Sequence, residues 1–391
     1  MPDAPATAEA LIDSIKQAGL LDASLEAAFR AVPRAAFLPN LPPDQVYKDE
    51  AVPIKVDEDG TVLSSSSQPS MMAIMLRQLD LKPGQNVLEI GAGTGYNAAL
   101  MQYLVGDEGK VTSIEIDAQV AEQARTNLQR AAMSQVFVVQ GDGAVGYAPR
   151  ASYDRIIVTA GIWDVPETWI RQMKPKSILV APIWMDGFEL SAALTLQPDG
   201  TLYSRDNRLC WFIRLRGQAI RTGKRRARRH QRAVRLFERA YRQRRAANAA
   251  LRRREETYLG VPLDTWEYWR GFLPYFVLNV PDTFTLARYH VDRDTAPYGI
   301  TASGFALIAP GSACFVPVGA QGAARSFGSA DALLAVQETI SAWERDGKPR
   351  QERLRMRLVP KGRSLDGVRG KVYTRRDHDL IAWLERGGTN A

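Results

Sequence analysis

The chain has 391 residues, which is longer than one ordinary domain, so we expect at least two domains. A hydrophobic fraction of 45% is typical of a globular protein, and no apolar run approaches the roughly 18–20 residues of a membrane-spanning helix. Cys210, Cys314 and three scattered histidines cannot build a zinc site. We therefore expect a cytoplasmic monomer with free thiols, no metal and no membrane partner.

The positive charge is concentrated in one segment. The chain carries a net charge of +8, yet residues 221–254 hold 15 lysines and arginines and one acid, Glu238. That segment is +14, which leaves about −6 for the rest. Its charge could bind nucleic acid through phosphates. It could equally be a solvated helix, and we favour a structural helix whose basic face attracts an acidic peptide.

The first half of the chain alternates helices and strands. Helices are predicted over 8–18, 67–81 and 118–131, and strands over 87–90, 111–116, 136–140, 154–159 and 177–182. This alternation is typical of a doubly wound parallel α/β sheet. Two further strands near 190–197 and 209–215, joined by a turn at 197–200, are expected to complete it.

The second half has a different composition. We expect a long helix over 225–257 and an aromatic-rich segment over 262–281. Two strands within 298–318, a helix over 331–345 and a strand over 351–358 follow. These elements predict a folded, mixed α/β C-terminal domain. The expected division is therefore a doubly wound α/β domain over 1–217, a basic helical connector over 218–257 and a C-terminal domain for substrate recognition over 258–391.

A glycine turn follows the first strand of the alternating series. Residues 87–96, VLEIGAGTGY, read as a buried strand and then glycines that let the backbone approach a ligand closely. The next two strands end in acids, of which Glu115 suits the hydroxyls of a ribose and Asp142 the amino group of an adenine. Because Glu89 would repel a diphosphate and attract a cation, the pattern favours S-adenosylmethionine over NAD.

Residues from about 8 to 217 resemble the protein-L-isoaspartate O-methyltransferase family. Separate segments carry the resemblance in order: PRAAFLP at 33–39, VYKDEAVPI at 46–54, SSSQP at 65–69, YDRIIVTAG at 153–161 and the stretch 173–182. The resemblance implies a Rossmann-like class I methyltransferase domain. It also implies methyl transfer from S-adenosylmethionine to a carboxylate, with S-adenosylhomocysteine as the product.

Methyl transfer to a carboxylate needs alignment more than acid–base help, because a carboxyl of pKa about 4 is already ionised at neutral pH. In the family a motif serine that maps to Ser67 holds the acceptor carboxylate. The residues alone also allow Ser64–Ser67 to be a loop and a helix N-cap, and Glu89 to be a buried structural acid. The expected catalytic residue is Ser67. The expected cofactor-binding residues are Ser64, Ser65, Ser66, Gln68, Glu89, Gly91, Ala92, Gly93, Gly95, Glu115, Ile116, Asp142, Gly143 and Thr159. The expected substrate-binding residues are Pro53, Ile54, Ser65, Ala160, Arg214 and Arg216.

Three departures from the family pattern all fall on the acceptor side. Residues 55–63 insert about six extra residues before the serines. The family's FVPLTG appears as FIRLRG at 212–217, and the chain continues to residue 391. Extended relatives resemble enzymes that tailor ribosomally made peptides such as lasso peptides, lanthipeptides and graspetides. We therefore expect methylation of an aspartate in an acidic peptide, which can carry earlier modifications, followed by cyclisation to an aspartimide. Repair of isoaspartate in damaged proteins is the alternative, and nucleic-acid binding is a third.

Overall fold

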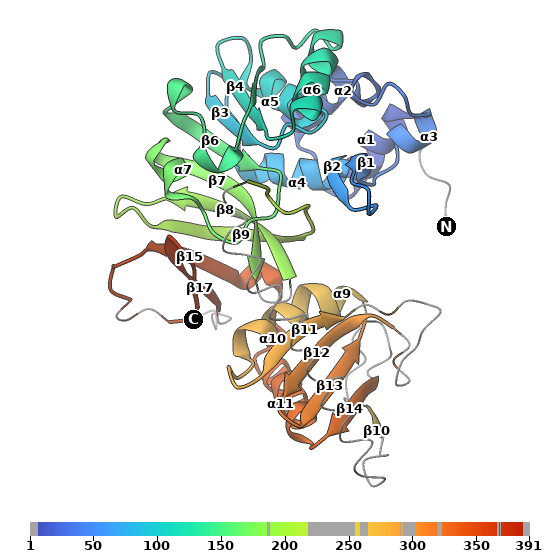
Figure 1. Ribbon diagram of the computed structural model, residues 1–391, viewed down its shortest axis with the longest axis vertical. Coiled ribbons are helices and arrows are strands. Elements are labelled where there is room, and N and C mark those ends of the chain that lie inside the picture. Colours follow the sequence, from blue (N-terminus) through green and yellow to red (C-terminus); the bar gives the residue numbers. More distant parts are fainter. Residues whose placement is uncertain are drawn as a thin grey trace.

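A computed structural model describes residues 7–185, 188–217, 255–258, 265–289, 302–318, 323–365 and 369–385, together with Val291, Ile300 and Gly367. Its main feature is a ten-stranded sheet with strand order β16-β17-β15-β9-β8-β7-β6-β3-β4-β5 (Figure 1). A five-stranded antiparallel sheet, β10-β14-β13-β12-β11, lies beyond its C-terminal strands. No helix of the described ranges is long and apolar enough to cross a membrane.

The chain begins with short helices and a β-hairpin that precede the strands of the large sheet. These elements are α1 (Ala8–Gln17), α2 (Ala23–Ala31), η1 (Arg34–Phe37), α3 (Pro43–Val46), β1 (Val52–Val56), β2 (Val62–Ser66) and α4 (Pro69–Leu79). α1 starts at the cap residue Thr7 and buries Leu11, Ile12 and Ile15 on one face, as the spacing of its apolar residues predicts. Neither α2 nor the hairpin was expected, because both lack a long periodic pattern.

The central strands run parallel, joined by helices on both faces. They are β3 (Asn86–Ile90), β4 (Lys110–Glu115), β5 (Phe137–Gln140), β6 (Tyr153–Val158) and β7 (Met173–Met185). The connecting elements are α5 (Tyr96–Val105), α6 (Ala118–Arg130), η2 (Gly143–Val145), η3 (Ala148–Arg150) and α7 (Glu167–Arg171). This is the class I methyltransferase arrangement, and it confirms the predicted doubly wound sheet. The helix expected over 67–81 starts later, at Pro69, with Gln68 as its N-cap.

Two antiparallel strands, β8 (Phe188–Leu196) and β9 (Leu202–Cys210), continue the sheet. The strand expected over 209–215 is misplaced. Gln197 and Thr201 close a tight hairpin turn through an N–H···O contact of 2.8 Å, so the second strand resumes at once and ends at Cys210. Residues 211–217 then lie beyond the sheet strands, with only an isolated bridge between Arg214 and Gly161.

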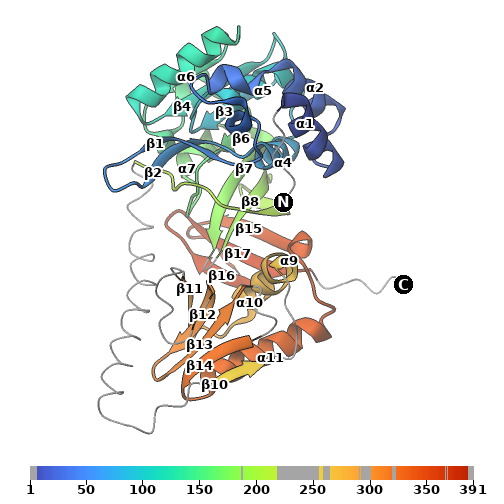
Figure 2. The ribbon, with the colours of Figure 1, turned by 90° about the vertical axis from the view of Figure 1, so that its right-hand side faces the viewer.

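The last strands of the chain return to the large sheet. β15 (Leu354–Pro360) pairs with β9, and β17 (His378–Leu384) and β16 (Lys371–Thr374) follow outside it. Figure 2 shows them between the methyltransferase part and the five-stranded sheet. The division of the chain into domains at residues 217 and 257 stays a prediction. The ten-stranded sheet contains strands from both sides of these boundaries. η7 (Gln351–Arg353) leads into β15, where the strand expected over 351–358 begins three residues late.

The remaining elements form a sheet covered by helices. The strands are β10 (Glu255–Tyr258), β11 (Thr285–Tyr289), β12 (Gly304–Ala309), β13 (Ser312–Pro317) and β14 (Ala323–Gly328). The helical elements are α9 (Thr265–Glu267), the π-helix η5 (Tyr268–Phe272), α10 (Leu273–Asn279) and α11 (Asp331–Arg345). One apolar core runs from β6–β8 through Phe272, Phe276 and Trp343 to Leu354. Residues 225–254 of the expected basic helix lie outside the described residues, whereas Glu255–Tyr258 are a strand.

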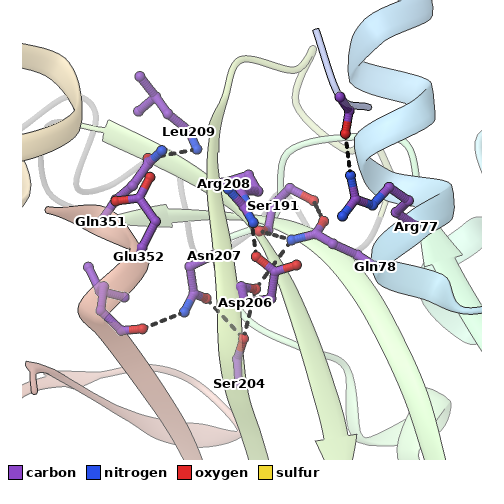
Figure 3. A network of polar contacts seen from close by, with 12 residues as sticks. Arg77, Gln78, Ser191, Ser204, Asp206, Asn207, Arg208, Leu209, Gln351 and Glu352 are labelled. Carbon is purple, nitrogen blue, oxygen red and sulfur yellow. Dashed lines mark hydrogen bonds and ion pairs between the residues drawn. The ribbon is translucent and has the colours of Figure 1, made fainter. Parts of the chain in front are cut away.

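A buried polar network joins β9 to its neighbours on both sides (Figure 3). Gln78 of α4 donates to the carbonyls of Ser191 and Asp206 at 3.0 and 3.2 Å. On the other side Asn207 Nδ2 donates to the Leu354 carbonyl at 2.9 Å, and Gln351 Oε1 accepts from the Leu209 N–H at 3.1 Å. Both amides are buried, so β15 is attached to β9 by side chains as well as by strand pairing.

Replacing Asn207 with alanine should destabilise the whole chain. The change removes two buried hydrogen bonds, while the Leu354 carbonyl keeps Arg355 and the Ser204 hydroxyl keeps the Asp206 carbonyl, so we expect a loss of about 0.5–1.5 kcal/mol for each bond. Urea unfolding followed by circular dichroism measures the loss, and Asn40→Ala at an exposed position is the control. Equal stability of the two variants would contradict a structural role for the network.

Candidate active site

A cavity of about 540 Å³ lies at the carboxyl ends of the parallel strands. Its walls come from the glycine turn after β3, the serines at the end of β2 and residues 209–216, which include the last two residues of β9. The sequence-predicted residues that line it are Pro53, Ser64, Ser65, Ser66, Ser67, Gln68, Gly91, Ala92, Gly93, Glu115, Ile116, Gly143, Thr159, Ala160, Arg214 and Arg216. The fold therefore brings most of the predicted cofactor and acceptor residues to one place.

The glycine turn allows a close backbone approach at one side of this cavity. Gly91 has a φ of +100°, and a Cβ there would lie 2.5 Å from Thr159 Oγ1. The Thr159 hydroxyl in turn contacts the Gly91 carbonyl at 2.8 Å, which ties the end of β6 to the turn. Gly95 lies outside the cavity wall. A Cβ there would meet the Ala124 carbonyl and Leu128 at 3.2 Å, so this glycine serves the packing of α5 on α6.

Glu115 is the carboxylate best placed for a ligand. It is buried in the cavity wall at the end of β4, and it accepts hydrogen bonds from the Gly93 N–H at 3.2 Å and the Asp117 N–H at 3.1 Å. Arg216 Nη2 lies 3.8 Å from Glu115 Oε1. These contacts fix the carboxylate between the glycine turn and residues 211–217.

Three other predicted residues lie outside the wall. Ile54 belongs to β1, and Asp142 accepts from the Ala144 N–H at 2.9 Å while its carboxylate faces Gly217. Glu89 is completely buried, where it accepts from Ser113 Oγ at 2.5 Å and Asn97 Nδ2 at 2.8 Å. Burial raises the pKa of Glu89 to about 7. These surroundings favour a structural role for Glu89 beneath the glycine turn.

The position of Ser67 depends on two residues that sequence reasoning did not single out. Arg34 is buried and donates to the carbonyls of Ser67, Lys48 and Glu50 at 3.1–3.3 Å. Asp49 accepts from the Ser70 N–H at 2.8 Å, so its carboxylate serves the first turn of α4, where the N-cap residue Gln68 makes no capping hydrogen bond of its own. None of the hydrogen bonds within the described ranges uses Ser67 Oγ, which leaves this hydroxyl available to a ligand in the cavity.

The inserted residues 55–63 form the outer part of the β1–β2 hairpin beside the cavity. Lys55 Nζ lies 2.6 Å from Asp117 Oδ2 and 2.9 Å from Gln119 Oε1, which fastens the hairpin to the start of α6. The same ion pair lowers the pKa of Asp117. A Cβ on Gly93 would lie 3.2 Å from the Ser65 carbonyl, so β2 passes close against the glycine turn. The hairpin is thus an ordered wall of the site.

Residues 211–217 form the opposite wall and are held by backbone contacts. The buried carboxylate of Glu189 accepts from the Phe212 N–H at 2.7 Å. Gly161 donates to the Ile213 carbonyl at 2.8 Å and accepts from the Leu215 N–H at 2.9 Å. Burial raises the pKa of Glu189 to about 7. We name residues 211–217 the acceptor-side segment.

Aromatic residues surround this segment. The Arg214 guanidinium lies 4.8 Å from the centre of the Trp184 ring, and Trp211, 45% exposed, meets Trp269 of the C-terminal part edge-on at 5.2 Å. Arg375, in the turn before β17, donates to the Trp184 carbonyl at 2.9 Å and to the Trp163 carbonyl. The C-terminal half therefore contributes to the surroundings of the cavity.

A buried amide also marks the cavity wall. Asn97, the second residue of α5, lines the cavity and donates from Nδ2 to Glu89, while its Oδ1 is buried without a partner in the part of the chain that the structure describes. An orphaned oxygen beside the glycine turn and Glu115 fits a ligand that carries N–H and hydroxyl donors. Arg34 and Asp49 lie inside quoted family segments and could have been found there. The positions of Asn97, Glu189 and Trp211 in the site result from long-range contacts, which no local sequence pattern indicates.

The family model for protein-L-isoaspartate(D-aspartate) O-methyltransferase matches residues 6–219. The chain belongs to this family. It is an S-adenosylmethionine-dependent methyltransferase with a class I fold, as the sequence predicts.

Relatives and a solved structure extend the match. A protein-L-isoaspartate O-methyltransferase from Methanopyrus kandleri is 37% identical over 212 residues, 54% of this chain and 91% of that protein. Another from Thermotoga maritima is 40% identical over 175 residues, 45% of this chain and 55% of that protein. A solved protein-L-isoaspartate O-methyltransferase, 26% identical with a TM-score of 0.52, covers 90% of this chain and 96% of its own. Structural similarity thus reaches into the C-terminal half.

The residues of the cavity fit the family's cofactor. S-adenosylmethionine supplies the methyl group when it is bound. The glycine turn would let the cofactor lie close to the backbone, and Glu115 would accept hydrogen bonds from its ribose hydroxyls. Asn97 Oδ1 offers an acceptor for the amino group at its amino-acid end. Across the cavity, Ser67 can donate to an acceptor carboxylate, and the hairpin and the acceptor-side segment limit the access of water.

Replacing Ser67 with alanine should separate catalysis from cofactor binding. The hydroxyl is proposed to orient the acceptor carboxylate, so turnover should fall by about 10- to 100-fold while the affinity for S-adenosylhomocysteine stays unchanged. Steady-state kinetics and calorimetry measure the two effects. Ser24→Ala, at an exposed position outside the cavity wall, is the control, and unchanged turnover in Ser67→Ala would remove Ser67 from the mechanism.

Glu189 should make the protein less stable as the pH rises. Its folded-state pKa of about 7 exceeds the ordinary value of 4.5, so the folded state holds this proton more tightly. The resulting stabilisation is complete below pH 4.5 and is lost as the pH rises to about 7. Glu189→Gln, which can still accept from Phe212, should reduce this loss in the free energy of unfolding by about 1–3 kcal/mol.

Urea unfolding at the two ends of that pH range tests the effect. Glu58→Gln changes an exposed acid in the hairpin turn and serves as the control. If Glu189→Gln loses as much stability with rising pH as the wild type, the burial of a charge at this position is not the cause.

Proposed function

We propose that this enzyme methylates the side-chain carboxylate of an aspartate in a ribosomally made peptide. The observation that carries the proposal is the make-up of the acceptor side. The hairpin, Arg214, Arg216 and the Trp211–Trp269 contact all fall where this chain departs from the family pattern. The cofactor side keeps the family's residues. Such a distribution suits a changed acceptor with an unchanged methyl donor.

The chemistry of the proposed reaction needs few groups. A carboxylate oxygen of the aspartate forms a bond to the methyl carbon as the bond from that carbon to sulfur breaks, which gives a methyl ester and S-adenosylhomocysteine. The backbone nitrogen of the next residue then attacks the ester carbonyl, loses its proton, and expels methanol to close the aspartimide. Ser67 would orient the first carboxylate, and the second step needs only the flexibility of the peptide backbone.

Repair of isoaspartyl residues is the competing function. The relatives from Methanopyrus kandleri and Thermotoga maritima are named protein-L-isoaspartate O-methyltransferases. The solved structure with the same name covers 90% of this chain, so an extended C-terminal half is compatible with that name as well. Nucleic-acid binding would depend on the basic residues of segment 221–254, which lies outside the described residues. No feature of the residues that the structure describes favours this function.

Mass spectrometry of candidate peptides separates the two functions. Aspartyl peptides encoded beside this chain's gene should gain the mass of a methyl ester and then lose methanol when incubated with the enzyme and S-adenosylmethionine. A generic isoaspartyl peptide of similar length should react at least about tenfold more slowly. Efficient methylation of the isoaspartyl peptide, with no reaction of any aspartyl peptide, would establish repair instead.

Variants of the C-terminal tryptophans provide the control. Trp269→Ala should lower kcat/KM for the aspartyl peptide without weakening S-adenosylhomocysteine binding, because Trp269 contacts Trp211 at the cavity. Trp383→Ala removes a tryptophan that stacks on Tyr203, away from the cavity wall, and should leave kcat/KM unchanged.

A further inference from the structure

Arg214 is a cation in the cavity wall that makes no ion pair within the described residues, although it interacts electrostatically with the buried Glu189 carboxylate. It is exposed, and within the described ranges no carboxylate lies at ion-pair distance from its guanidinium. Arg216, two residues later, differs because it faces Glu115 at 3.8 Å. Each arginine stands where the family pattern has an uncharged residue, so neither is part of the shared cofactor site.

The surroundings of Arg214 hold its guanidinium in place. The group lies 4.8 Å from the centre of the Trp184 ring, and the backbone on either side is fixed by the two Gly161 hydrogen bonds and by Phe212 on Glu189. A guanidinium stacked on an aromatic face keeps its in-plane N–H donors for a planar anion. The nearby Glu189 carboxylate is buried, and it accepts from the Phe212 backbone at 2.7 Å.

Carboxylates of the ligand are the natural partners of such a group. Guanidinium and carboxylate match as bidentate hydrogen-bonding partners, and the match is stronger where water is partly excluded. The reacting carboxylate is assigned to Ser67, which lines the same cavity, and we assign Arg214 to a separate group. The charge at Arg214 therefore points to a second anionic group on the acceptor.

We propose that Arg214 binds the side chain of an acidic residue that flanks the methylated residue, and so selects acceptors with two neighbouring carboxylates. The inference deepens the proposed function, on which it rests for the nature of the acceptor. Arg214 acts as a specificity residue: it holds the neighbouring side chain while Ser67 orients the reacting one. The acceptor class is thus an acidic peptide segment, with an aspartate beside a second aspartate or glutamate.

Equilibrium binding to synthetic peptides tests the proposal without requiring turnover. Four fluorescein-labelled peptides share one sequence and contain either an aspartate or an isoaspartate, each flanked on both sides by glutamate or by glutamine. Fluorescence anisotropy in the presence of S-adenosylhomocysteine gives the dissociation constants. Wild-type enzyme should bind the glutamate peptides about tenfold more tightly than the glutamine peptides, as expected for a charge-assisted hydrogen bond.

Variants of Arg214 assign the preference to this side chain. Arg214→Gln should abolish the tenfold preference, and Arg214→Glu should reverse it in favour of a peptide with flanking lysines. Arg208→Ala removes an arginine of β9 that pairs with Asp206 outside the cavity wall, and should keep the preference. A merely structural role for Arg214 would weaken binding of all peptides alike and would not reverse the charge preference.

The outcomes separate this inference from the proposed function. A preference for flanking acid that depends on Arg214 supports the inference in either peptide series. If it occurs only with the isoaspartyl peptides, the tailoring function is wrong and the inference survives. Equal binding of glutamate and glutamine peptides, binding of neither, or a preference that persists in Arg214→Gln would overturn the inference.

Discussion

The pairing of β9 with β15 is the constraint on which the acceptor side depends. β9 ends at Cys210 and leads directly into residues 211–217, so the position of that strand decides where the acceptor-side segment begins. Without β15, β9 would be an exposed edge strand with unpaired backbone groups. Asn207 and Gln351 reinforce the pairing with buried hydrogen bonds that span 147 and 142 residues of sequence. β15, from the C-terminal half, therefore helps to position the acceptor-side segment of a site that the N-terminal half forms.

Acidic and basic side chains meet in the cavity wall. Glu115 pairs with Arg216 at 3.8 Å, whereas Arg214 lines the acceptor-side segment without an ion pair within the described residues. S-adenosylmethionine is a cation at its sulfur, and its acceptor here is an anion. Glu115 can attract the first and Arg214 the second, and each attraction is larger in a partly enclosed cavity than in water. The charges of the cavity therefore suit a cationic donor and an anionic acceptor.

Local patterns were sufficient for the parallel sheet but not for its extension. The glycine turn and the acids after β4 and β5 fall at fixed distances from apolar strands, so their meeting at one edge follows from the topology of parallel strands. The β1–β2 hairpin has no such pattern, because its strands are short and largely half-buried. The return of β15 to β9 and the contact of Trp211 with Trp269 join distant segments. A single sequence contains no local signal for such contacts.

The loop after β6 shows why this arrangement can change acceptors without harming the cofactor site. Thr159 at its start is bonded to the glycine turn, while Trp163 and Asp164 are held by the turn before β17 through Arg375 and the Asp377 N–H. One short loop is therefore anchored at its first end by the cofactor side and at its other end by the C-terminal strands. Gly161 lies between the two anchors and fixes the acceptor-side segment through its backbone. Substitutions in the C-terminal half can alter the acceptor wall through this loop, while the bonds that shape the glycine turn stay intact.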